Sequence, residues 1–241
     1  EKEILQSKRL ASIGILVAGV AHELNNPLNN ISMMAQTYME VYDNLEREQR
    51  IDFMERVEEE TERLRVIIKN LLDFSRAKER HLVENVANNV IQKTIALVRN
   101  MLNVSNIQLR LDLADDLPTI YVDEHQVQQV LVNITTNAIQ AMGNTGVLFL
   151  RSSYLADADE VEFEIRDTGP GIEAKFLDHI FDPFFTTKEE GGTGLGLWVS
   201  YGIIKNHGGN LRVESSADDG TAFFVTLPSC KSVKECCDGQ A

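Results

Sequence analysis

The chain has 241 residues, of which 43% are hydrophobic and 25% are charged, a composition typical of a globular protein of one or two domains. Its 37 acidic residues outnumber its 23 basic ones and give a formal net charge of -14, so a nucleic acid, itself a polyanion, would be repelled and is excluded as a partner. All three cysteines follow residue 229, where they cannot cross-link a core, which favours a reducing compartment.

Apolar residues recur at alternating spacings of three and four over residues 10–45, the pattern of a heptad seam on a long helix. After the polar stretch of residues 46–50, a second seam runs over residues 53–74. Two long helices joined by a short polar turn predict an antiparallel hairpin. Because one such hairpin buries little apolar surface, we expect two copies to pair as a four-helix bundle, which makes the protein a homodimer.

Beyond the hairpin the pattern changes to a mixture of strands and helices. Apolar and polar residues alternate over residues 107–113 and 161–165, which predicts strands, and helical spacing predicts a helix over residues 127–142. Two further strands near residues 210–214 and 221–227 complete an α+β sandwich with helices on one face of a sheet. We therefore predict a hairpin domain over residues 1–82, a second domain over 83–229 and a disordered tail over 230–241.

The longest apolar stretch, residues 13–21, includes two glycines and is well short of the roughly 20 residues that span a bilayer, so no transmembrane helix is predicted. The sequence begins without Met, directly in a charged helical pattern. We interpret this start as a cut inside a longer helix, so that an upstream domain is missing.

His22 lies in the segment AHELNNPLNN and points away from the heptad seam. Glu23 is adjacent, and Asn26 lies one turn further on the same face. Pro27 removes the backbone hydrogen bond to the carbonyl of Glu23 and loosens the helix beside the histidine. An exposed imidazole next to a carboxylate suits nucleophilic attack, although a solvated surface histidine fits this segment equally well. Asn26 stands where a zinc-binding H-E-x-x-H motif needs its second histidine.

Asn133 and Asn137 lie one turn apart on the predicted helix over residues 127–142, opposite its apolar stripe. Amide oxygens can ligate a hard cation, and amide N–H groups can donate to phosphates. Taken alone, the pair is more typical of a solvated helix face.

Two glycine-rich segments follow. The predicted strand over residues 161–165 runs into Asp167, Gly169 and Gly171, where glycines let the backbone approach a ligand and the carboxylate could accept from an amine such as that of adenine. Alone, this D-x-G-x-G pattern is often only a turn. The second segment, GGTGLGL, leads into a helix and predicts an anion cradle. It has neither the GK[ST] of a P-loop nor a G-x-G-x-x-G fingerprint. Between them FDPFFTTKEE, with Lys188, is predicted to be a lid.

Together and in this order, these segments resemble the sensor histidine kinases of two-component signalling. AHELNNPL is similar to their H box, QQVLVNITTNAIQAM to their N box, DTGPGI to their first glycine box, FDPFF to their F box and GGTGLGL to their second glycine box. The resemblance implies that the second domain is the ATP-binding α/β sandwich shared with gyrase, a chaperone ATPase and MutL. The pair Asn25 and Asn26, with the TTK after the F box, looks most like the subgroup related to nitrogen-regulation sensors.

The resemblance also implies a role for each matching residue. His22 would be phosphorylated, with Glu23 as its acid/base partner, and Asn26 would act in dephosphorylating the partner's aspartyl phosphate. Asn133 and Asn137 would hold Mg²⁺ and the phosphates of ATP.

For the nucleotide, Asp167 would accept from the adenine amino group in a pocket that Gly169 and Gly171 shape, and Lys188 would reach the γ-phosphate. The loop around the triphosphate would consist of Gly192, Thr193, Gly194, Leu195 and Gly196.

The implied activity is that of an ATP-dependent protein-histidine kinase that autophosphorylates His22 and passes the phosphoryl group to an aspartate of a response regulator. Phosphatase activity toward that regulator is also implied. We expect the cytoplasmic portion of a bacterial protein. Two alternatives stay open: an ATPase of the same fold that drives dimer closure, and a dimeric scaffold whose glycine turns are structural.

Overall fold

The computed structural model describes residues 21, 24–75, 81–188, 193–216 and 219–230. The chain divides into two compact units. The first, called the hairpin unit, joins Glu1–Arg76 to Asp182–Leu195, and the second, called the sheet unit, joins Ala77–Phe181 to Gly196–Ala241.

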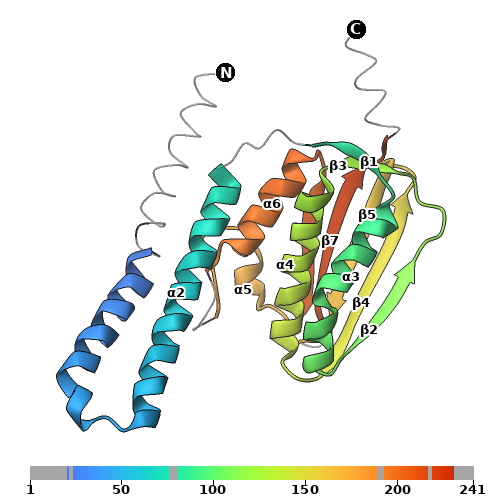
Figure 1. Ribbon diagram of the computed structural model, residues 1–241. Coiled ribbons are helices and arrows are strands. Elements are labelled where there is room, and N and C mark those ends of the chain that lie inside the picture. The colour runs from blue at the N-terminus through green and yellow to red at the C-terminus, as the bar shows by residue number, and fades with distance from the viewer. Residues whose placement is uncertain (1–20, 22–23, 76–80, 189–192, 217–218, 231–241) are drawn as a thin grey trace, which may run out of the picture. The chain divides into compact units, whose positions relative to one another are not determined.

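The hairpin unit contains a helix over residues 24–41, the short 3-10 helix η1 (Tyr42–Asn44) and the antiparallel helix α2 (Arg47–Ser75) (Figure 1). The two long helices contact through Asn30, whose Nδ2 donates to Glu60 Oε1 at 2.8 Å, and through Tyr38, whose ring meets that of Phe53 edge-on at 5.8 Å. The predicted hairpin is confirmed.

The turn of the hairpin lies earlier than predicted, because most of the polar stretch of residues 46–50 belongs to α2. Gln49 Oε1 accepts the Glu46 backbone N–H at 3.0 Å and so caps the start of the helix. Arg50 donates to the Tyr42 carbonyl at 3.0 Å and stacks over the Tyr42 ring. Charged and amide side chains are good helix formers, so polarity alone does not identify a turn.

Large apolar side chains remain exposed along both helices of the hairpin unit. Met33 is 62% exposed and Met39 70%, and on α2 the exposed fractions of Met54 and Ile68 are both 47%. Ile67, in contrast, is fully buried. A hairpin with so much exposed apolar surface lacks a complete core of its own.

The sheet unit contains a five-stranded sheet in the order β2-β4-β5-β7-β6 (Figure 1). β2 and β4 are parallel, whereas the pairs β4–β5, β5–β7 and β6–β7 are antiparallel. These strands are β2 (Ile107–Leu113), β4 (Gly146–Leu155), β5 (Glu160–Asp167), β6 (Asn210–Ser216) and β7 (Gly220–Pro228). A separate two-stranded sheet pairs β1 (Val83–Asn85) with β3 (Ile120–Val122).

One face of the five-stranded sheet, called the inner face, is covered by α3 (Ala87–Val104), α4 (Glu124–Met142) and α6 (Gly196–Asn206) (Figure 1). On β5 the inner-facing Phe163 and Ile165 are buried, whereas Glu164 and Arg166 point to the other face and pair at 2.9 Å. The predicted apolar stripe of α4 is buried from Val127 to Ala138. The short helix α5 (Ala174–Leu177) follows the D-x-G-x-G turn. The predicted combination of a helical hairpin with an α/β sandwich is confirmed.

Cys230 differs from the expectation that residues 230–241 form a disordered tail. It is 5% exposed, and its N–H donates to the Thr119 carbonyl at 2.8 Å. Ser229 is also buried and bridges to Ile120. The chain stays ordered there because strand β7 carries it directly past the residues that precede β3. Residues 231–241 lie outside the described part of the chain. Of the helices described, none combines the length and the apolarity that crossing a membrane requires.

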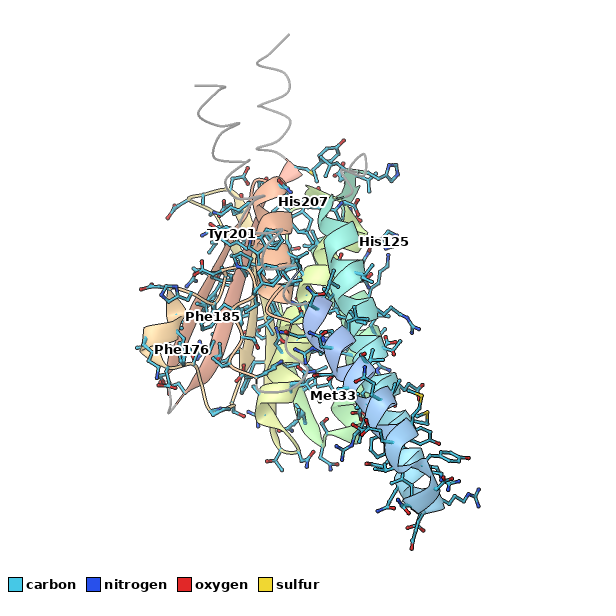
Figure 2. The ribbon with its side chains drawn as sticks, turned by 90° about the vertical axis from the view of Figure 1, so that its left-hand side faces the viewer. Met33, His125, Phe176, Phe185, Tyr201 and His207 are labelled. Atoms are coloured by element: carbon cyan, nitrogen blue, oxygen red, sulfur yellow. The ribbon has the colours of Figure 1, made fainter. Side chains whose placement is uncertain are left out.

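His207 lies directly after the end of α6 (Figure 2) and hydrogen-bonds to the start of α4. Its Nε2 accepts the Asp123 N–H at 3.1 Å, so the proton lies on Nδ1, which donates to the Ile203 carbonyl at 2.8 Å. We expect His207→Ala to destabilise the sheet unit by about 2 kcal/mol, because a buried side chain is lost and two hydrogen bonds with it.

Urea unfolding followed by the fluorescence of Trp198, the single tryptophan and a residue of α6, measures this loss. His125→Ala is the matched control, since His125 is an exposed histidine on the first turn of α4 (Figure 2), and it should shift stability by less than about 0.5 kcal/mol. Equal effects of the two variants would contradict the role given to His207.

Candidate functional site

Asp167 lies at the end of β5, in a row of paired residues that crosses the inner face. The row runs from Leu148 on β4 through Asp167 and Thr221 to Ser215 on β6, each residue pairing with the next. Asp167 is 4% exposed and Thr221 6%. The Asp167 carboxylate thus lies buried on the face of the sheet that the helices cover.

The Asp167 carboxylate is held by two backbone donors. Oδ1 accepts the Gly169 N–H at 2.8 Å and the Thr221 N–H at 3.3 Å. Burial raises the pKa of Asp167 above its ordinary value, and the two N–H donors only partly oppose that rise. With both bonds on Oδ1, Oδ2 is the oxygen that can accept from a ligand.

The D-x-G-x-G turn places Gly169 between Asp167 and α4. A Cβ at Gly169 would lie 2.9 Å from Asp167 Oδ1 and 3.6 Å from Ala141 Cβ, so a side chain there would press on the carboxylate. Gly171 has a φ of +72°, which L-residues with a side chain rarely adopt. Gly169 therefore leaves the Asp167 carboxylate undisturbed, and Gly171 allows the chain to turn just beyond it.

Asn133 and Asn137 lie one turn apart on α4, both half-buried. Asn133 Nδ2 donates to Ser200 Oγ at 3.0 Å, and its Oδ1 is the atom that a Cβ on Gly196 would meet, at 2.6 Å. The first residue of α6 is therefore packed on the side chain of Asn133. The N–H groups of a helix N-terminus can bind an anion, and an amide oxygen beside them can ligate a cation.

The face of α4 that carries these residues connects the two ends of the site. Asn133, Asn137 and Ala141 follow one another at intervals of four, with the α6 N-terminus at Asn133 and the Gly169 turn at Ala141. Eight residues of helix measure about 12 Å. A ligand along this face would contact an anion site at one end and a buried carboxylate at the other.

The second glycine segment has its own contacts within the hairpin unit. The Phe184 N–H donates to the Gly194 carbonyl at 3.0 Å, and a Cβ on Gly194, whose φ is +62°, would lie 2.3 Å from the Phe184 carbonyl carbon. Leu195 is buried, and its N–H donates to Thr193 Oγ1 at 3.4 Å. The predicted lid and the predicted loop are thus joined at Phe184 and Gly194.

Lys188 lies in the same unit, and its backbone N–H donates to Thr186 Oγ1 at 3.1 Å. Partial desolvation lowers the pKa of the Lys188 ammonium. Asn26 is half-buried and stands next to the buried Pro27 in the helix over residues 24–41. His22, Glu23 and Gly192 lie outside the described residues.

Three contacts of the site were not predicted from the sequence, those of Ser200, Ser215 and Thr221. Ser200 lies one turn beyond Gly196 and holds Asn133. Thr221 directly follows the turn glycine Gly220, and its place beside Asp167 depends on the pairing of β5 with β7. The sequence signal for Thr221 and Ser215 is weak, because neither belongs to a glycine-rich motif.

Two family models match the chain. One, described as "His Kinase A (phospho-acceptor) domain", covers residues 12–80. The other, described as "Histidine kinase-, DNA gyrase B-, and HSP90-like ATPase", covers residues 122–231. Between them they include the candidate residues of both units.

Curated relatives match over nearly the whole chain. Sporulation kinase E of Bacillus subtilis is 36% identical over 235 residues, which are 98% of this chain and 31% of that protein. Sensor histidine kinase ZraS of Escherichia coli K12 is 37% identical over 229 residues, 95% of this chain and 48% of that protein. The chain thus spans about a third to a half of the length of these relatives.

Solved structures give the same family. The catalytic domain of histidine kinase ThkA is 30% identical with a TM-score of 0.56, and the match covers 62% of this chain and 96% of that one. ThkA in complex with the response regulator protein TrrA is 27% identical with a TM-score of 0.77, covering 94% of this chain and 64% of that one. On these matches, the chain belongs to the sensor histidine kinases.

Proposed function

We propose that the chain is an ATP-dependent protein-histidine kinase that phosphorylates its own His22 and passes the phosphoryl group to an aspartate of a response regulator. The observation that carries the proposal is the face of α4 from Asn133 to Ala141, with a helix N-terminus at one end and Asp167 at the other. Its length of about 12 Å suits a nucleotide whose phosphates and base are bound at opposite ends.

At the base end, Asp167 Oδ2 would accept from the adenine amino group, and Gly169 and Gly171 would leave room for the purine. At the phosphate end, Asn133 Oδ1 faces the start of α6, and Asn137 follows one turn later. Amide oxygens are ligands that fit Mg²⁺, which when bound would offset the negative charge of the phosphates.

The loop residues would enclose the triphosphate through their backbone N–H groups, and Lys188 would contact the γ-phosphate. This loop comprises Gly192, Thr193, Gly194, Leu195 and Gly196. The resemblance to the second glycine box supports this assignment, and the bond from Phe184 to Gly194 supports a loop that moves together with its lid.

In the phosphorylation step a ring nitrogen of His22 would attack the γ-phosphorus in line with the bond to ADP. A nitrogen–phosphorus bond forms, the phosphorus–oxygen bond to the β-phosphate breaks, and Glu23 would accept or hold the ring proton. The product is a phosphoramidate, from which the phosphoryl group would pass to the regulator's aspartate. Asn26 would orient the attack of water in a phosphatase reaction on that aspartyl phosphate.

Residues 1–82 would form the dimerisation and phosphotransfer domain and residues 83–229 the catalytic domain. The exposed apolar side chains of the hairpin, Met33 and Met39 among them, support pairing of two copies as a four-helix bundle. The share of the relatives that the chain spans supports an upstream sensor domain in the full protein. The pair Asn25 and Asn26 supports membership of the subgroup related to nitrogen-regulation sensors.

Incubation with γ-labelled ATP and Mg²⁺ tests the proposal. We expect label on the protein that is stable in base and labile in acid, as a phosphoramidate is, and none on His22→Gln. Asn137→Ala should bind Mg·ATP at least about tenfold more weakly, since it loses a contact to a charged ligand.

An ATPase that only drives dimer closure would release labelled phosphate with no label on the protein, and His22→Gln would hydrolyse ATP at the wild-type rate. A scaffold would bind no Mg·ATP in calorimetry. Either pattern would contradict the proposal.

A further inference from the structure

Ser215 stands at the end of the row of paired residues that crosses the inner face, beside the proposed base pocket. It pairs with Thr221, which in turn pairs with Asp167. The Ser215 hydroxyl oxygen lies 2.8 Å from the Ile172 nitrogen, 3.0 Å from the Gly220 carbonyl oxygen and 2.9 Å from Thr221 Oγ1. One hydroxyl therefore has three polar neighbours from two segments of the chain, the turn after β5 and the start of β7.

Counting protons and lone pairs gives the direction of each bond. A hydroxyl has one proton and two lone pairs. The Gly220 carbonyl only accepts, so it takes the Ser215 proton, and the Ile172 N–H only donates, so it occupies one lone pair. The remaining lone pair accepts from Thr221, whose hydroxyl proton is thereby committed to Ser215.

We propose that Ser215 is a positioning residue: by holding the Thr221 hydroxyl proton, it leaves hydrogen-bond acceptors along the edge of the proposed base pocket and so favours adenine over guanine. The proposal rests on the proposed function, since it assumes a purine beside Asp167. With its proton on Ser215, Thr221 Oγ1 presents lone pairs, as Asp167 Oδ2 does. Adenine carries an amino donor where guanine carries a carbonyl acceptor, so this edge satisfies adenine and leaves the guanine oxygen facing acceptors.

Ser215 also ties down the turn that follows Asp167. Ile172 comes directly after Gly171, whose positive φ redirects the chain, and its N–H is anchored on Ser215. The same turn supplies the Gly169 N–H to Asp167, and β7 supplies the Thr221 N–H. One hydroxyl thus braces both segments that hold the carboxylate.

The test compares dissociation constants of Mg·ATP and Mg·GTP by calorimetry on the full chain. Ser215→Ala releases the Thr221 proton, which can then be donated to the guanine oxygen, so the preference for ATP should fall on the order of fivefold. Ser215→Thr keeps a hydroxyl and should restore the preference. Ser216→Ala is the matched control, because the Ser216 hydroxyl bonds only to Asp219 within the β6–β7 turn among the described contacts.

A double-mutant cycle separates this role from a merely structural one. In a Thr221→Val background, which keeps the backbone N–H to Asp167, Ser215→Ala should leave the ratio of the two constants unchanged, since no hydroxyl remains to be directed. If Ser215 had only a structural role, Ser215→Ala would weaken the binding of both nucleotides equally, and this loss would persist in the Thr221→Val background. An unchanged ratio in Ser215→Ala alone, or an equal change in both backgrounds, overturns the proposal.

Amide hydrogen exchange of the nucleotide-free chain distinguishes this proposal from the proposed function. The Ile172 amide should be protected in the wild type and in Ser215→Thr, and should exchange faster in Ser215→Ala. An unprotected Ile172 amide in the wild type overturns the positioning role even if ATP binds. If that amide is protected but ATP does not bind, the proposed function fails, and the selection of adenine fails with it.

Discussion

Asp167→Asn is expected to weaken ATP binding by about 10- to 100-fold, the loss typical of a charged hydrogen bond. The asparagine oxygen can replace Oδ1 and keep the bonds from Gly169 and Thr221. On the proposed assignment, its amino group would then stand where Oδ2 accepts, and two donors would meet at the adenine amine. Calorimetry with Mg·ATP measures the loss, and the urea midpoint of Trp198 fluorescence checks that the sheet unit stays folded.

Asp112→Asn is the control for this change, because the Asp112 side chain is 79% exposed on the edge strand β2. It makes the same chemical substitution away from the site and should bind ATP as the wild type does. If Asp167→Asn bound ATP equally well, adenine would not be held by this carboxylate.

The raised pKa of Asp167 adds a pH dependence to the same prediction. In the free chain, burial raises the pKa of Asp167 above its unfolded value. The stability that the protonated carboxyl contributes is therefore fully present below the unfolded pKa and is lost as the pH rises through the folded pKa. If Asp167 accepts from adenine as proposed, ATP binding needs its ionised form, so the affinity for ATP should fall as pH drops through the raised pKa, by up to about tenfold per pH unit. The fall should start at higher pH than for an ordinary aspartate.

Measuring ATP affinity of the wild type and Asp167→Asn across acidic pH isolates this titration, because protonation of the phosphates affects both proteins. The difference between the two curves should shrink as the pH falls. Parallel curves would contradict the assignment.

Gly196→Ala is the second change with a large expected effect, a loss of ATP affinity of at least about tenfold. The new Cβ would lie 2.6 Å from Asn133 Oδ1, so the amide must leave its place beside the helix N-terminus. The fold should be retained, since alanine favours a helix. Calorimetry and the rate of His22 labelling both measure the effect.

Gly202→Ala provides a matched control on the same helix, where an added Cβ meets nothing within 4 Å. It should stabilise α6 by up to about 1 kcal/mol and leave ATP binding unchanged. Equal ATP affinities of the two alanine variants would show that Asn133 need not occupy this place.

The periodicity of the sequence was enough to predict both long helices, the strand β5 and the apolar face of α4, because those features depend on residues that are neighbours in the chain. The same spacing placed Asn133 and Asn137 on one helix face. The roles of the candidate residues, in contrast, came from the order of five motifs and their resemblance to a family, and they stay predictions. The polar turn was misplaced by a few residues, since a charged stretch can equally begin a helix.

The tertiary structure decided which of these residues meet. Asp167 lies 54 residues before Thr221, and the two share a row only because β5 and β7 pair in one register. Ser215 joins this row from six residues before Thr221, across the β6–β7 turn. A slip of one residue would turn every side chain of a strand to the opposite face. The packing of Gly196 on Asn133 likewise depends on how α6 lies against α4. Periodicity is local, whereas register and helix packing arise from long-range contacts that no short motif contains.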